Sequence, residues 1–273
     1  IVKGWKEGEP VLVGTAFYYH DALIVAKAAA VLGKHREPRS YARLARQIKE
    51  AFNRAFYDPV NQQYDRGNQF GNAFPLFLGL VPPSQGPQVL RQILDGLQRN
   101  GGHFDVGVLG AKYLIEALTD YGRADVAYAL AVQTGFPSWA HMLDGGRTTL
   151  SEFWDLHGSH NHVMMGSIDG WFYRTLAGIQ PDEEQPGFRH FNIQPFIPDS
   201  LANVSASIQT VQGRVAVDWK KEAGLLRMHV TVPANTTATV HVPVRSTHQV
   251  RTTPSLGRPR IEKGAAVFRV GSG

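Results

Sequence analysis

The segment from Thr148 to Trp171 holds the side chains of this sequence that are best suited to chemistry. It reads TTLSEFWDLHGSHNHVMMGSIDGW. The carboxyl group of Glu152 is followed at once by Phe153 and Trp154, and three histidines come shortly after. Carboxylates move protons, aromatic faces cover the apolar C–H side of a sugar ring, and imidazoles hydrogen-bond hydroxyl groups. The segment therefore predicts part of a site for a carbohydrate.

The histidines of this segment allow a second interpretation. His157, His160 and His162 could bind a transition metal together with Glu152 or Asp155. The segment lacks the helical i, i+4 pair of an HExxH motif, so we expect neither a metal nor another cofactor. A structural role also stays open, with Glu152 capping or pairing near a helix start and the histidines only packed.

Residues 13 to about 181 are expected to form successive helices. Between Ser40 and Asp58 apolar residues recur every four positions among charged ones, which predicts an amphipathic helix with Ser40 as its N-cap. The run from Val106 to Tyr121 has a similar pattern, and Gly122 stands where a helix C-cap favours a left-handed residue. Further helices are expected over residues 12–32, 70–80, 88–99, 124–133 and 162–177, which makes about seven in all.

The pattern changes after Pro181 to the alternation of half-buried strands. Val215, Val217 and Trp219 fall on one face of such a strand, and two later segments repeat the pattern. Turn residues separate these segments, as in Glu222-Ala223-Gly224. Residues from about 186 to 273 are therefore expected to form an antiparallel β-sandwich with Trp219 in its core.

The composition of the chain excludes several classes of protein. Of its 273 residues, 43% are hydrophobic and 19% are charged, and no apolar run approaches the ~20 residues that span a bilayer. The net charge of +5 comes from basic residues scattered along the chain, so we expect neither a nucleic-acid nor a membrane partner. The absence of cysteine excludes disulfides and thiolate zinc sites, and leaves the cellular compartment open.

Several segments together resemble the α-L-rhamnosidase family of inverting glycoside hydrolases. Among them are TAFYYHDALIVAKAAAVLGK, NQFGNAFPLFLGLVP, GGRTTLSEFWD, HNHVMMGSIDGWFYRTLAGIQPD and VPANTTATVHVP, and the full set covers nearly the whole chain. The resemblance implies an α+β multidomain chain, with residues 1–181 as the C-terminal portion of an (α/α)6 catalytic toroid and residues 182–273 as a C-terminal β-sandwich domain. Since a complete toroid has more than seven helices and Ile1 is not a methionine, the missing N-terminal part of the same protein is expected upstream.

The resemblance also implies roles for particular residues. Glu152 matches the general base of the family motif TT-x-x-E-x-W-D, and His162 matches a histidine that hydrogen-bonds the bound rhamnose. Trp5 matches the tryptophan of a family Gly-Asp-Trp triplet whose indole lies against the sugar, although the triplet here is Lys3-Gly4-Trp5 and lacks the acid. Trp139 and His103 fall in loops expected at the same end of the toroid, where each is either a pocket wall or a packed anchor.

The function that the resemblance implies is hydrolysis of a terminal, non-reducing α-L-rhamnosyl residue from a glycoside or polysaccharide. Inversion needs a second carboxyl, the general acid, about 6.5–9.5 Å from the base, and the family's acid motif has no match in this chain. Two alternatives stay open. One is another toroid carbohydrate enzyme such as a phosphorylase, although no clustered Arg, Lys, Ser and Gly loop offers a phosphate site. The other is a sugar-binding module without catalysis.

Overall fold

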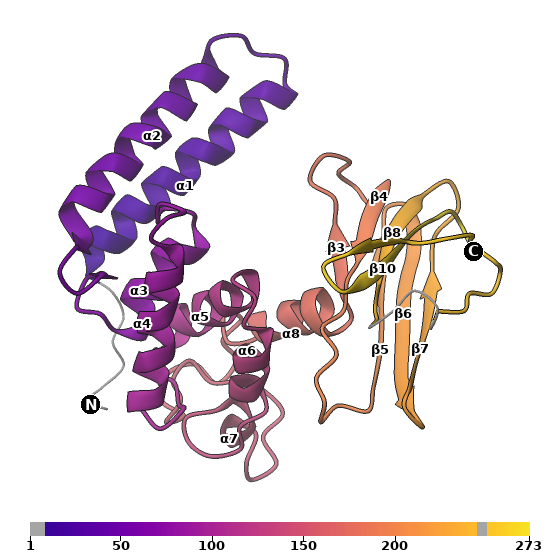
Figure 1. Ribbon diagram of the computed structural model, residues 1–273. Coiled ribbons are helices and arrows are strands. Elements are labelled where there is room, and N and C mark those ends of the chain that lie inside the picture. The colour runs from indigo at the N-terminus through magenta and orange to yellow at the C-terminus, as the bar shows by residue number, and fades with distance from the viewer. Residues whose placement is uncertain (1–8, 245–249) are drawn as a thin grey trace. The chain divides into compact units, whose positions relative to one another are not determined.

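The computed structural model describes residues 9–244 and 250–273 and divides into two compact units. The first unit spans residues 1–167 and is helical, whereas the second spans residues 168–273 and consists mainly of strands (Figure 1). The predicted change from helices to strands is therefore confirmed. In the described part of the chain, no helix is both long enough and apolar enough to cross a membrane.

The helical unit contains seven α-helices and a short hairpin in its described residues. The helices are α1 (Pro10–Val31), α2 (Glu37–Phe56), α3 (Gln69–Phe77), α4 (Gly86–Arg99), α5 (Val108–Asp120), α6 (Ala124–Ala131) and the one-turn α7 (Trp139–Met142). The hairpin pairs β1 (Tyr57–Asp58) with β2 (Gln63–Tyr64). An eighth helix, α8 (Ser167–Trp171), continues into a π-helical turn, Phe172–Leu176. A helix was predicted over residues 162–177, but residues 163–166 form turns and α8 begins five residues later than expected.

Helix ends explain two outcomes of the sequence predictions. The predicted N-cap at Ser40 is wrong, because α2 already begins at Glu37 with Pro38 in its first turn. Proline suits that turn, since its φ is helical and its missing N–H would have no helical partner. The predicted cap at Gly122 is confirmed by a φ of +76° and by a bond from the Arg123 N–H to the Leu118 carbonyl at 2.7 Å.

Aromatic packing between α3 and α5 forms the centre of the helical unit. Phe74 lies 4.9 Å from Phe70, measured between ring centroids, and 4.7 Å from Tyr113. Gly110 permits this approach, because a Cβ atom there would lie 2.6 Å from the Cβ atom of Val106 and 3.0 Å from the Phe70 ring. The first turns of α3 and α5 are thereby held together, and so are the segments that precede them.

The second unit is built from two sheets. Five strands form one sheet in the order β3-β4-β8-β10-β9, and three strands form the other in the order β5-β6-β7. Their bounds are β3 Ile179–Pro181, β4 His190–Ile193, β5 Asn203–Thr210, β6 Gly213–Glu222, β7 Leu225–Thr231, β8 Thr237–Pro243, β9 Arg260–Glu262 and β10 Ala265–Val270. The expectation of purely antiparallel pairing was wrong at one place, because β4 and β8 run parallel.

The two sheets share one hydrophobic core. Phe191 and Val240 of the larger sheet are buried in the same cluster as Val217 and Trp219 of β6. Trp219 is 1% exposed, and its indole N–H donates to the Leu176 carbonyl at 2.7 Å. This packing confirms the predicted sandwich and the core role of Trp219.

One helix of the first unit leaves an apolar stripe exposed. Val11, Tyr18 and Val25 of α1 follow each other at seven-residue spacing and are 69%, 54% and 40% exposed. Seven residues make almost two helical turns, so these side chains lie on one face of the helix. Contiguous apolar surface of this kind drives association.

We therefore expect the 273-residue chain to self-associate through α1. Replacing Tyr18 and Val25 together by lysine should shift its mass toward the monomer in size-exclusion chromatography with light scattering. The matched control replaces Val60 and Val211 by lysine in the same way. These residues are 87% and 85% exposed but lie outside the stripe, so their replacement should leave the association unchanged. A monodisperse monomer before any substitution would contradict the expectation.

Candidate active site

The segment that contains Glu152 folds back on itself. The backbone N–H of Glu152 donates to the Ser159 carbonyl at 2.7 Å, and the N–H of His162 donates to the Leu150 carbonyl at 2.9 Å. The Thr149 hydroxyl donates to the carbonyl of His160. These bonds close a tight loop over residues 153–158. We call residues 149–162 the Glu152 loop.

The loop holds the carboxylate of Glu152 in one place. The backbone N–H of Ser159 donates to its Oε2 atom at 3.1 Å. Gly158 packs beneath this atom with a φ of +74°, and a Cβ atom there would lie only 2.6 Å from Oε2. No hydrogen bond from the described residues reaches the other oxygen, Oε1. The half-buried carboxylate is thus fixed through one oxygen and available to water or a ligand through the other.

A buried tryptophan anchors the loop to the rest of the helical unit. Trp154 has no exposed surface, and its indole N–H donates to the Val106 carbonyl at 2.7 Å. Its ring stacks on Phe104 at a centroid distance of 5.2 Å and meets Trp139 edge to face at 5.3 Å. The Trp139 N–H in turn donates to the Met165 carbonyl at 3.0 Å. Both sides of the Glu152 loop are therefore fixed by buried indoles.

The segment that receives the Trp154 bond is itself tied to α3. Gln69, the first residue of α3, is 1% exposed. Its side-chain amide donates to the His103 carbonyl at 2.9 Å and accepts a bond from the Asp105 N–H at 3.0 Å. The start of α3, the segment before α5 and the Glu152 loop thus form one hydrogen-bonded assembly.

The histidines predicted from the sequence lie in different environments. His157 is 79% exposed in its side chain, with its Nδ1 atom 3.2 Å from Asp155, and His160 is also exposed. His162 is half-buried, and its buried Nδ1 atom has no hydrogen-bond partner among the described residues, as is also true of His103. Across residues 9–244 and 250–273, no group of three or more His, Asp or Glu side chains converges as a metal site would require. The metal interpretation therefore has no geometric support in that part of the chain.

The structure brings most of the predicted site residues into one assembly. Glu152 and His162 belong to the same loop, and His103 precedes the segment that anchors it. Trp139 is 6% exposed, so its geometry supports the packed anchor among the two roles left open for it. Trp5 lies outside the described residues.

Sequence reasoning missed the residues that support the carboxylate. Ser159 contributes a backbone N–H and Val106 a backbone carbonyl, and such groups carry no signal in the residue type. Gly158 was visible in the sequence, but the requirement for glycine at this position follows only from the nearby Oε2 atom of Glu152. Gln69 lies one residue before the helix expected over residues 70–80, and nothing in its residue type or spacing marked its side chain as buried.

Comparison with known proteins identifies the family to which this chain belongs. Residues 3–176 match the bacterial alpha-L-rhamnosidase six-hairpin glycosidase domain, and residues 178–255 match the bacterial alpha-L-rhamnosidase C-terminal domain. The chain therefore belongs to the alpha-L-rhamnosidase family.

Individual relatives agree with this assignment. An alpha-L-rhamnosidase of Streptomyces avermitilis is 32% identical over 96% of this chain and 26% of its own length. One from Formosa agariphila is 30% identical over 88% of this chain and 27% of its own. The crystal structure of the Streptomyces avermitilis enzyme complexed with L-rhamnose superposes with a TM-score of 0.90, at 30% identity, over 99% of this chain and 27% of that one. The chain thus spans about a quarter of the length of these relatives.

The Trp154 anchor generates a prediction on stability. Trp154→Phe removes the donor to Val106 and leaves that buried carbonyl unpaired, which should lower the free energy of unfolding by about 1–3 kcal/mol. Urea unfolding followed by circular dichroism at a helical wavelength measures this change. The control Phe153→Leu alters the adjacent side chain, which is 39% exposed, and should stay within about 0.5 kcal/mol. Equal stability of the two variants would mean that the indole bond does not anchor the loop.

Proposed function

We propose that this chain supplies the general base and part of the sugar pocket of an α-L-rhamnosidase. The reaction is hydrolysis of a terminal, non-reducing α-L-rhamnosyl residue with inversion at the anomeric carbon. The observation that carries the proposal is the carboxylate of Glu152, which is fixed by Ser159 and Gly158 and keeps one oxygen available. Membership of the rhamnosidase family supports the choice of sugar.

The base acts on water in this reaction. A water molecule hydrogen-bonded to Oε1 of Glu152 attacks the anomeric carbon from the face opposite the leaving group, and its proton passes to the carboxylate. The bond between the anomeric carbon and the glycosidic oxygen breaks, and a second carboxyl group protonates that oxygen as it leaves. A base held in one position reduces the entropic cost of bringing water and sugar together.

We place the general acid in a part of the protein that precedes this chain. The chain spans about a quarter of its relatives' length, which leaves room for the rest of the catalytic domain. In the proposed enzyme, His162 hydrogen-bonds the rhamnose hydroxyls through its ring, and Trp5 covers an apolar face of the sugar. Trp139 and His103 act as positioning residues, through Trp154 and the segment before α5 respectively.

The role of Glu152 is tested by Glu152→Gln in the longer protein that the proposal requires. The amide keeps the shape of the side chain but cannot accept the proton of water, so turnover of an aryl α-L-rhamnoside should fall at least about 10²-fold while KM changes little. The control Glu50→Gln makes the same chemical change on an exposed position of α2 and should leave turnover unchanged. Near wild-type turnover of Glu152→Gln would remove this residue from the mechanism.

A glycine pair tests whether the position of the carboxylate matters. Gly158 and Gly145 have similar φ angles of +74° and +72°, so alanine strains the backbone similarly at both. Only at Gly158 would the new methyl group meet the carboxylate of Glu152, since nothing lies within 4 Å of a Cβ atom at Gly145. Gly158→Ala should therefore reduce turnover at least about tenfold more than Gly145→Ala, because a displaced base loses its alignment. Equal rates for the two variants would show that Gly158 does not position the base.

A further inference from the structure

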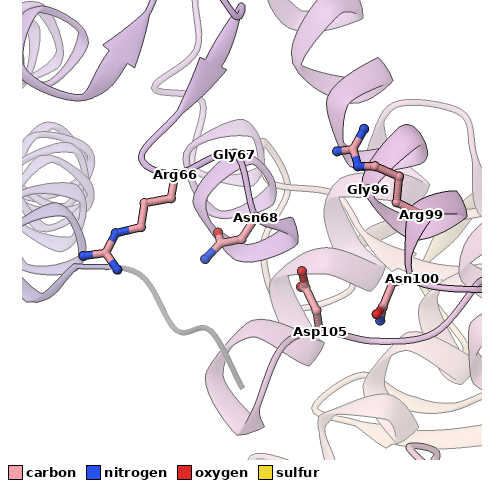
Figure 2. A pocket seen from close by; sticks show the side chains of 7 residues that line it. All are labelled: Arg66, Gly67, Asn68, Gly96, Arg99, Asn100 and Asp105. Atoms are coloured by element: carbon pink, nitrogen blue, oxygen red, sulfur yellow. The ribbon is translucent and has the colours of Figure 1, made fainter. Parts of the chain in front are cut away.

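The backbone at His103 is held in place by hydrogen bonds. Residues 101–104 link the end of α4 to the segment before α5, and their neighbours Asn100 and Asp105 border a polar hollow that opens to solvent (Figure 2). The side-chain amide of Asn100 donates to the His103 carbonyl at 2.9 Å and to the Phe104 carbonyl at 3.1 Å. The position from which the His103 imidazole projects is therefore fixed.

Gln133 contacts the same stretch of backbone. It follows α6, and its Nε2 atom donates to the Gly102 carbonyl at 2.7 Å. A carbonyl oxygen only accepts hydrogen bonds, so this contact decides which end of the Gln133 amide faces Gly102. The other end, Oε1, is buried and has no hydrogen-bond partner among the described residues. An acceptor in need of a donor thus lies beside the peptide group that joins Gly102 to His103.

The imidazole of His103 supplies the complementary atom. The ring is half-buried, and its Nδ1 atom is enclosed with no partner in the described part of the chain. Buried polar atoms are almost always hydrogen-bonded to protein or to an ordered water molecule. Oε1 of Gln133 and the second lone pair of the Gly102 carbonyl can only accept, so a water molecule that donates to both must accept from the ring. The ring proton then lies on Nδ1.

We propose that Gln133, through one buried water molecule, holds His103 in the neutral tautomer that is protonated on Nδ1. Nε2 then carries a lone pair and no proton, so it accepts a hydrogen bond from a sugar hydroxyl. The next residue, Phe104, stacks on Trp154 at 5.2 Å, which places the imidazole in the same assembly as the Glu152 loop. Gln133 is thereby a positioning residue, and the contact with sugar rests on the proposed rhamnosidase function.

The tautomer is measured directly by two-bond ¹⁵N–¹H NMR correlation of the 273-residue chain with labelled histidine rings. The spectrum is recorded at about pH 8, where free histidine is neutral. The signal of His103, assigned by its loss in His103→Gln, should show a protonated Nδ1 and an unprotonated Nε2. The opposite pattern, which free histidine prefers, would overturn the proposal without the need for any variant of Gln133.

Two glutamine variants assign the tautomer to its cause. Gln133→Met removes the amide with little change in side-chain length and should reverse the pattern, so that His103 carries its proton on Nε2. The matched control is Gln85→Met, because the Oε1 atom of Gln85 is also buried without a partner among the described residues but lies at the start of α4. It should leave the tautomer unchanged. An unchanged pattern in Gln133→Met, or the same reversal in Gln85→Met, would contradict the role of Gln133.

Kinetics of the longer protein test the contact with sugar. Gln133→Met should raise KM for an aryl α-L-rhamnoside about three- to tenfold with little change in kcat, the scale of one hydrogen bond between neutral groups. An unchanged KM would overturn this contact. A protein with the Nδ1 tautomer that fails to cleave rhamnosides would exclude the proposed function and leave the role of Gln133 standing. Cleavage by a protein with the opposite tautomer would exclude the role of Gln133 and leave the function standing.

Discussion

The bond from the Trp154 indole to the Val106 carbonyl is the interaction on which the candidate site depends. It joins the Glu152 loop, which has no regular secondary structure, to the segment before α5. Because both groups are fully shielded from water, the bond has no solvent competitor, and its loss would leave a buried carbonyl unpaired. The ring of Phe104 also stacks on the Trp154 indole, so the loop is fixed in orientation as well as in position.

The remaining features of the site follow from that anchor. With the loop fixed, the Ser159 N–H and the bare backbone of Gly158 define where the Glu152 carboxylate lies. Gln69 ties the same segment to the start of α3. The packing of α3 against α5 therefore supports the position of the carboxylate. A site on loops gains its precision from such support.

The sequence revealed much of this organisation, for identifiable reasons. Helix periodicity located α2 and α5, and alternation located β6 with its buried Trp219, because burial on one face imposes a spacing on the residues. Glu152 was visible from its residue type and aromatic neighbours, although its catalytic role stays a prediction. The support of its carboxylate was not visible, because it comes from backbone groups of Ser159 and Val106. The parallel pairing of β4 with β8 was missed, since alternation does not encode strand direction.

The central claim is that Glu152 activates water and does not itself attack the sugar. Proton NMR of the first product released from an aryl α-L-rhamnoside tests it most directly, because the anomeric configuration is recorded before mutarotation. A base acting on water predicts that β-L-rhamnose, the inverted anomer, appears first. Initial release of the α anomer would contradict the account, since retention requires a carboxylate that forms a covalent intermediate.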